Sequence, residues 1–151
     1  MTVEKLRIED IIARRGQYVS TSAGVIMFPM LRNRRDTVVI RPVSGRLKKY
    51  DVPLYRRKSD GAYVLHRIIE VRADSYVIRG DNCFNKEYDI EDSQIIGVLS
   101  EFYRGNRHVL CDSRGFRIYS RLAVAVHPLQ MTFMRIYPRV KSLLKRVYKK
   151  A

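Results

Sequence analysis

Short runs of β-branched, aromatic and other apolar residues recur from residue 17 to residue 111, and clusters of turn-forming residues separate them. Runs bounded in this way are typical of β-strands. Ser59-Asp60-Gly61, between two of the runs, favours a hairpin turn. Strands that arrive about every ten residues with tight turns between them predict a mainly β, antiparallel, barrel-like domain. The predicted strands are residues 17–22, 37–40, 52–57, 63–71, 76–79, 95–103 and 108–111.

The segments on either side of these strands have helical patterns. Thr2 is a suitable N-cap and Gly16 a suitable stop, which predicts a short helix over about residues 3–14. From Phe133 onward, apolar residues recur at three- and four-residue steps between bases, which predicts a basic amphipathic helix. We therefore divide the chain into an N-terminal helix (1–16), a β domain (17–115) and a basic amphipathic helical tail (116–151).

Positive charge is concentrated in the C-terminal part of the chain. The formal net charge is +15, and the segment after residue 103 contains many basic residues but a single acidic one, Asp112. A segment of this composition is attracted to a polyanion, either anionic lipid or nucleic acid. The sequence has no aromatic-glycine RNA motif, zinc finger or helix-turn-helix pattern, so a nucleic-acid-binding barrel is the less favoured interpretation. The bases are Arg104, Arg107, Arg114, Arg117, Arg121, Arg135, Arg139, Lys141, Lys145, Arg146, Lys149 and Lys150.

Two interpretations of the tail stay open at this point. A basic amphipathic helix is the pattern of a segment that lies on a membrane surface, which predicts a partner of anionic lipid. The alternative is a terminal helix that docks its apolar face on the barrel. Residues 122–134 are apolar but too few for a membrane span of about 20 residues. The first residues carry acids and no apolar run of signal-peptide length, so we expect no secretory signal and a peripheral membrane or cytoplasmic location.

The two cysteines carry little information about function. Cys83 and Cys111 lie far apart and form no metal-ligand spacing. We expect two free thiols, a reducing compartment, and neither a metal nor a cofactor.

Four short segments appear in a fixed order within residues 17–103. The first is Gly24-Val25-Ile26-Met27-Phe28-Pro29-Met30-Leu31, and residues 47–52 are the second. The third, residues 64–69, contains His66-Arg67, and the fourth is Arg79-Gly80-Asp81-Asn82. Together they resemble the type I signal peptidase and LexA-like serine peptidase superfamily. The His-Arg pair is similar to the endoplasmic-reticulum and archaeal signal peptidases, whereas Tyr50 stands where that family usually has glycine.

The resemblance implies a signal-peptidase/LexA-like coiled antiparallel β-barrel and a role for each matching residue. His66 would be the general base, because an imidazole titrates near neutral pH. Asp81 would orient that base, although a salt bridge to Arg67 would equally satisfy it. Gly24, Val25, Met27 and Pro29 would form the substrate-binding or oxyanion loop, with Gly24 allowing a close approach of the chain.

Ile26 occupies the position at which the family has its nucleophilic serine. A hydrocarbon side chain can neither attack a carbonyl nor exchange a proton, so we expect the chain to be inactive or nearly so. Either the chain is a natural binding-only relative in which Ile26 is native, or it is a variant of an active enzyme in which isoleucine replaces the serine. The leading hypothesis is a domain that binds an extended leader or signal peptide as an added strand and cleaves it when serine stands at position 26. The second hypothesis is a catalytically dead peptide-binding or scaffold module.

Overall fold

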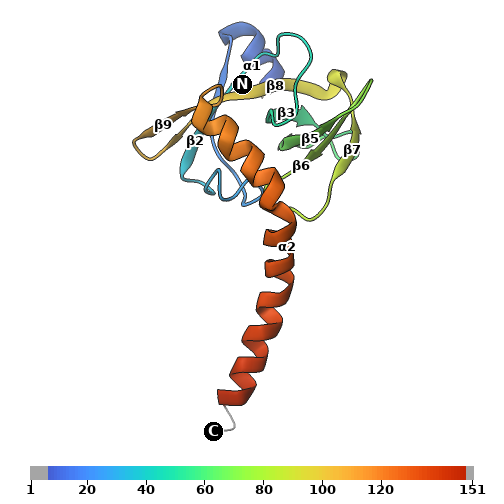
Figure 1. Cartoon of the computed structure of the whole chain (residues 1–151). Helices are drawn as coiled ribbons and strands as arrows, with labels where there is room; N and C mark the ends of the chain where they lie inside the picture. The colour runs from blue at the N-terminus through green and yellow to red at the C-terminus, as the bar shows by residue number, and fades with distance from the viewer. Residues whose placement is uncertain (1–6, 149–151) are drawn as a thin grey trace, which may run out of the picture.

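The computed structural model describes residues 7–148, with side chains up to residue 142. The chain is mainly β, with a short helix at the start and a long helix at the end (Figure 1). The short helix α1 (Ile8–Arg15) ends at Gly16, whose φ of 71° and bond to the Ile12 carbonyl are typical of a helix stop. The predicted N-terminal helix is confirmed over this range, and residues 1–6 lie outside the described part.

Two antiparallel sheets make up the β domain. The larger sheet has the strand order β1-β2-β8-β3-β4, with β9 paired to β8, and it curls into a half-barrel (Figure 1). The smaller sheet has the order β5-β6-β7. The larger sheet comprises β1 (Tyr18–Thr21), β2 (Asp36–Arg41), β3 (Pro53–Arg56), β4 (Tyr63–Leu65), β8 (Ile95–Arg104) and β9 (Arg107–Leu110), and the smaller comprises β5 (Arg67–Val71), β6 (Tyr76–Arg79) and β7 (Glu87–Ile90), which is followed by the 3-10 turn η1 (Asp92–Gln94).

The predicted single strand over residues 63–71 is wrong, because the chain changes sheets within it. β4 pairs with β3 in the larger sheet, and β5 pairs with β6 in the smaller one. His66 is the one residue between them. The change of sheet escapes detection in the sequence because no Gly, Pro or other turn residue marks it. Its consequence is that His66 lies at the junction of the two sheets.

Two groups of buried side chains hold this arrangement together. One, around Tyr55, Ile68 and Tyr76, lies with the smaller sheet. The other joins the larger sheet to α1 and includes Met27, Met30 and Leu31. Burial of a Met or Leu side chain contributes about 1.5–3 kcal/mol, so these three residues fix the loop that precedes β2 against the core. The loop therefore has a defined place although it has no regular secondary structure.

The long helix α2 (Arg114–Tyr148) begins after Ser113, whose Oγ accepts a hydrogen bond from the Phe116 amide at 3.3 Å. Its first half packs on the β domain and its second half extends away from it (Figure 1). The side chains that it buries are Phe116, Ser120, His127 and Met131. The interpretation in which the apolar face of the tail docks on the barrel is wrong for Phe133, Ile136, Tyr137 and Val140, which are exposed, and the side chains from residue 143 onward lie outside the described part.

Candidate functional site

The loop of residues 24–31 is shaped by short-range hydrogen bonds and one glycine. The Gly24 amide donates to Asn33 Oδ1 at 2.8 Å, and the Leu31 amide donates to the Met27 carbonyl at 2.9 Å. Gly24 has a φ of 83°, and a Cβ placed there would meet no atom within 4 Å. Glycine is therefore favoured at position 24 by its backbone conformation, and no atom of the described chain approaches closely there.

The close approach occurs instead at Gly80, on the turn that follows β6. A Cβ at Gly80 would lie 2.3 Å from Ile26 Cγ2 and 2.9 Å from the Ile26 carbonyl oxygen. The Asn82 amide donates to that carbonyl at 2.8 Å, and Asn82 Nδ2 donates to the Val25 carbonyl at 3.2 Å. The first and fourth sequence segments are thus locked together, with the Ile26 side chain over the bare Cα of Gly80.

Gly80→Ala is expected to lower the free energy of unfolding by about 1–3 kcal/mol, because the added methyl must displace a backbone oxygen as well as a side chain. Denaturant unfolding of the variant measures this loss. Gly115→Ala is the control: its Cβ would meet nothing within 4 Å and it lies within α2, so we expect no loss or a small gain. Equal stabilities of the two variants would contradict the tight contact at Gly80.

The register of the smaller sheet places His66 beside this contact. Arg67 pairs with Arg79 and Ile68 with Ile78, so the register continued by one residue sets His66 opposite Gly80. Opposite residues of an antiparallel pair carry their side chains on the same face, with Cα atoms about 4.5–5.5 Å apart. The side chain of Ile26 fills the space over Gly80 on that face. Positions 26 and 80 are therefore in contact, and the strand pairing that ends at Arg67 and Arg79 leads from His66 toward them.

The environment of His66 suits a neutral imidazole. The side chain is buried, and its Nδ1 lies 3.2 Å from the Tyr55 hydroxyl and 3.2 Å from Glu87 Oε1. Burial lowers the pKa of His66 below 6.5, and the nearby Glu87 carboxylate opposes this only in part. Burial alone would raise the pKa of Glu87, but hydrogen bonds from Arg57 and Tyr55 lower it below its ordinary value. Glu87 is therefore an ionised acceptor that favours the His66 tautomer protonated on Nδ1.

The second ring nitrogen of His66 has no partner. Among the side chains of residues 7–142, Nε2 of His66 is one of two buried polar atoms that make no hydrogen bond. Buried polar groups are otherwise almost always paired, because an unmade bond costs about 1–3 kcal/mol. In the tautomer that Glu87 favours, Nε2 carries a free lone pair. It is a base with no proton donor beside it.

Asp81 pairs with Arg67. Its two carboxylate oxygens accept from Arg67 Nε at 2.8 Å and from Nη2 at 2.7 Å. Side chains that follow each other along an extended strand point to opposite faces, so His66 and Arg67 face different partners. The sequence left two partners open for Asp81, His66 and Arg67, and in the structure Asp81 forms the salt bridge with Arg67. The carboxylate within hydrogen-bond reach of His66 is Glu87, which the sequence did not indicate because β7 is not recognisable as a strand.

The remaining residues of the loop divide between the core and the surface. Met27 is buried, whereas Val25, Ile26, Phe28 and Pro29 are exposed. The peptide bond between Phe28 and Pro29 is cis. Ile26 donates its amide to no backbone carbonyl among residues 7–148. The loop thus presents an apolar surface and a backbone donor that has no partner among these carbonyls.

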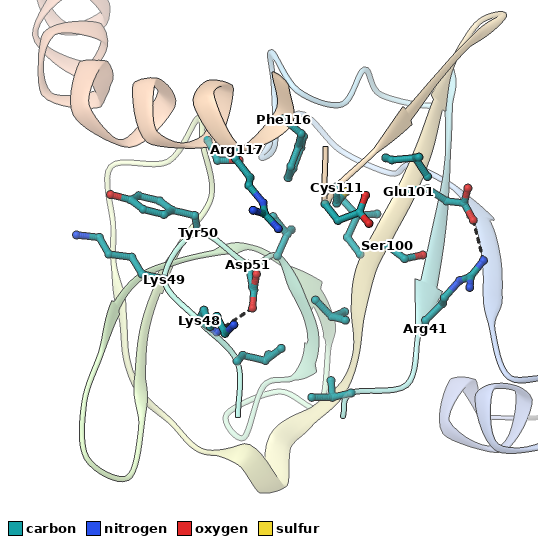
Figure 2. A pocket seen from close by; sticks show the side chains of 18 of the residues that line it. Arg41, Lys48, Lys49, Tyr50, Asp51, Ser100, Glu101, Cys111, Phe116 and Arg117 are labelled. Carbon is teal, nitrogen blue, oxygen red and sulfur yellow. Dashed lines mark hydrogen bonds and ion pairs between the residues drawn. The ribbon is translucent and has the colours of Figure 1, made fainter. Parts of the chain in front are cut away.

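A cleft of about 710 Å³ is lined by residues that include Lys48, Tyr50 and Asp51, Ser100 of β8, and Phe116 and Arg117 of α2 (Figure 2). Arg67 Nη1 donates to Ser120 Oγ at 2.7 Å and to the Tyr50 carbonyl at 3.2 Å, and both acceptor residues line the cleft. Neither His66 nor Ile26 lines it. Arg67 is thus hydrogen-bonded both to residues that line the cleft and to Asp81.

Other chemistry has little support in the described part of the chain. Among residues 7–148, no group of three or more His, Cys, Asp or Glu side chains could hold a metal ion. Cys83 and Cys111 are free thiols, as expected, and burial raises the pKa of both, that of Cys111 to about 12. Both are therefore protonated and weakly nucleophilic at neutral pH.

In comparisons with family models, curated proteins and solved structures, the chain matches none of them.

Proposed function

We propose that this chain is a signal-peptidase-like domain that binds an extended leader or signal peptide, and that it would cleave the peptide if residue 26 were serine. The observation that carries the proposal is the unpartnered Nε2 of buried His66, opposite the glycine against which Ile26 packs. A serine hydroxyl at position 26 would supply the proton donor that this nitrogen lacks. With isoleucine at position 26, the chain is a binding domain whose hydrolytic site lacks its nucleophile.

The site residues support a serine mechanism in which His66 moves the proton. The hydroxyl of a serine at position 26 attacks the peptide carbonyl carbon, and His66 Nε2 takes its proton. Glu87 holds the Nδ1–H group and stabilises the imidazolium, while the free amide of residue 26 is placed to donate to the oxyanion. His66 then returns the proton to the leaving amine as the peptide bond breaks. Water hydrolyses the acyl-enzyme with His66 again acting as the base.

The edge of the larger sheet that leads to the site offers a place for the peptide. Among the described strands, β1 pairs with β2 alone. The Ser22 amide bonds to the Asp36 carbonyl, so Ser20 opposite Val38 is the next hydrogen-bonded pair. In an antiparallel ladder these pairs alternate with pairs whose backbone groups point outward. Thr21 is therefore expected to present its amide and carbonyl to the open edge, a few residues before Ile26.

Thr21→Pro tests this mode of binding because it removes one outward amide from an edge strand, where proline is tolerated. We expect its affinity for labelled synthetic leader peptides to fall about tenfold, the effect of one hydrogen bond at the upper end of the usual range. Fluorescence anisotropy with the otherwise unaltered chain measures the affinity. Thr21→Ala, which keeps the amide, should bind within twofold of the original. Equal binding by the proline and alanine variants would refute the added-strand mode, and no binding by any of the three would refute the proposed function.

A further inference from the structure

The helix α2 has two different faces. The face against the β domain carries Phe116, Ser120, His127 and Met131, all buried. At 100° per residue, the centre of the other apolar set lies on nearly the opposite side of the helix. Its members are 45–71% exposed, which is unusual for so many large apolar side chains in one row. They are Ile118, Leu122, Val126, Leu129, Phe133, Ile136 and Val140, here named the outer stripe.

The outer stripe is continuous and long. Its residues follow each other at steps of three or four, which keeps them on one side of a helix. Over the 35-residue helix the stripe extends about 33 Å at 1.5 Å per residue. Contiguous apolar patches of this extent on a soluble surface mark a binding site. The stripe needs an apolar partner that the described part of the chain does not provide.

The charges on α2 restrict what that partner can be. Between Arg114 and Tyr148 the sequence has eight bases and no acid. Arg121, Arg135 and Arg139 lie along one border of the outer stripe by their helical positions. Long basic side chains at the border of an apolar stripe can keep their charges at a headgroup level while their stems lie along hydrocarbon. The partner is therefore both apolar and anionic.

An anionic bilayer surface is both apolar and negatively charged, whereas a second copy of α2 or a nucleic acid has only one of these two properties. A second copy of α2 would cover the stripe but would add eight further bases with no acid to pair them, which disfavours a helical dimer. Nucleic acid would neutralise the bases and leave the stripe in water. No described helix is long and apolar enough to cross a membrane.

We infer that α2 lies in the interface of an anionic bilayer, with the outer stripe in the acyl region and the β domain on its opposite face. The inference does not depend on the proposed function, but it places the candidate site. His127 Nε2 bonds to the Cys83 carbonyl at 2.8 Å, and Gln130 Nε2 donates to Asn82 Oδ1 at 3.3 Å. The turn that holds Ile26 is thus attached to the inner face of α2. One helix diameter, about 10 Å, separates that turn from the lipid.

Vesicle flotation of the full chain tests the inference. We expect the chain to float with phosphatidylcholine vesicles that contain about a third phosphatidylglycerol, and to float at least tenfold less with phosphatidylcholine alone. The bound fraction should fall as salt is raised from about 0.05 to 0.5 M. Leu129→Gln/Phe133→Gln removes the two most exposed members of the stripe and should reduce flotation at least tenfold. Arg139→Gln/Lys141→Gln should reduce it several-fold and weaken the dependence on anionic lipid.

Val71→Gln/Tyr88→Gln is the matched control, since both residues are exposed apolar side chains on the β domain. It should float like the original, and circular dichroism should give all three double variants the original melting temperature. Equal flotation of the stripe variant and the control would overturn the inference. So would a dimer that the stripe variant abolishes, or binding to a DNA duplex in a chain that does not float.

Discussion

Ile26→Ser is expected to give the chain peptide-cleaving activity at a rate about a thousandfold or more above that of the unaltered chain. Removal of a nucleophile costs several powers of ten in rate, and its return to a site with an intact base should recover a large part of them. The proposed base, His66, is buried, lies within 3.2 Å of Glu87 through Nδ1, and is unpartnered at Nε2. Mass spectrometry of leader peptides after incubation measures the products.

Two further variants separate this chemistry from a general effect of the substitution. Ile26→Ala removes the same bulk over Gly80 without adding a hydroxyl, and it should cleave no faster than the unaltered chain. Ile26→Ser/His66→Ala keeps the hydroxyl and loses the base, and it should be equally inactive. Cleavage by either one at the rate of Ile26→Ser, or no turnover by Ile26→Ser of any peptide that the chain binds, would refute a Ser-His site.

The pH profile of Ile26→Ser follows from the state of His66. A general base works only when it is unprotonated, and burial lowers the pKa of His66 below 6.5. As the pH falls, the rate should therefore hold through 6.5 and decline only at lower values. Since the Glu87 carboxylate raises the pKa of His66 against the effect of burial, Glu87→Gln in the serine background should move the acid limb still lower. An acid limb above 6.5 would contradict the buried environment.

The sequence predicts most of the fold because strand and turn patterns are local. The strands over residues 37–40, 76–79 and 95–103 are confirmed, as is the antiparallel pairing. The sequence does not predict β7, because two of its four residues are acidic. The strand is also irregular, since Asp89 has a left-handed φ of 57°. The change of sheet at His66 was not predicted either. It depends on which strands the two halves pair with, and pairing is not a local property.

The site shows the same limit. The sequence brings together Ile26, His66 and the Gly80 turn through a resemblance, and the structure has Ile26 in contact with Gly80. The sequence alone does not show whether Asp81 pairs with His66 or with Arg67, because these two residues are adjacent in the chain and their side chains point to opposite faces. It also gave no sign of Glu87, whose approach to His66 depends on the register of β7 against β6.

Arg67→Met is expected to lower the free energy of unfolding by about 3–5 kcal/mol, the cost of leaving a buried charge without its partner. Arg67 is fully buried, and both oxygens of Asp81 accept from it. Its guanidinium also lies 5.7 Å from the centre of the Phe116 ring, so the loss reaches the docking of α2. For a chain of this size the melting temperature should fall by roughly 10 °C, which thermal unfolding measures.

Arg72→Met controls for the loss of an arginine as such, because Arg72 pairs with Glu70 and Asp89 at a solvent-screened site and its loss should leave the stability nearly unchanged. Arg67→Met/Asp81→Leu removes both buried charges and should recover a large part of the loss. Equal stabilities of Arg67→Met and Arg72→Met would show that the buried pair does not hold the fold. If the pair does hold it, Asp81 variants lose cleavage in the serine background together with their melting temperature. Glu87→Gln should instead lower the rate through His66, with a measurable pH profile and a smaller loss of melting temperature than the Asp81 variants.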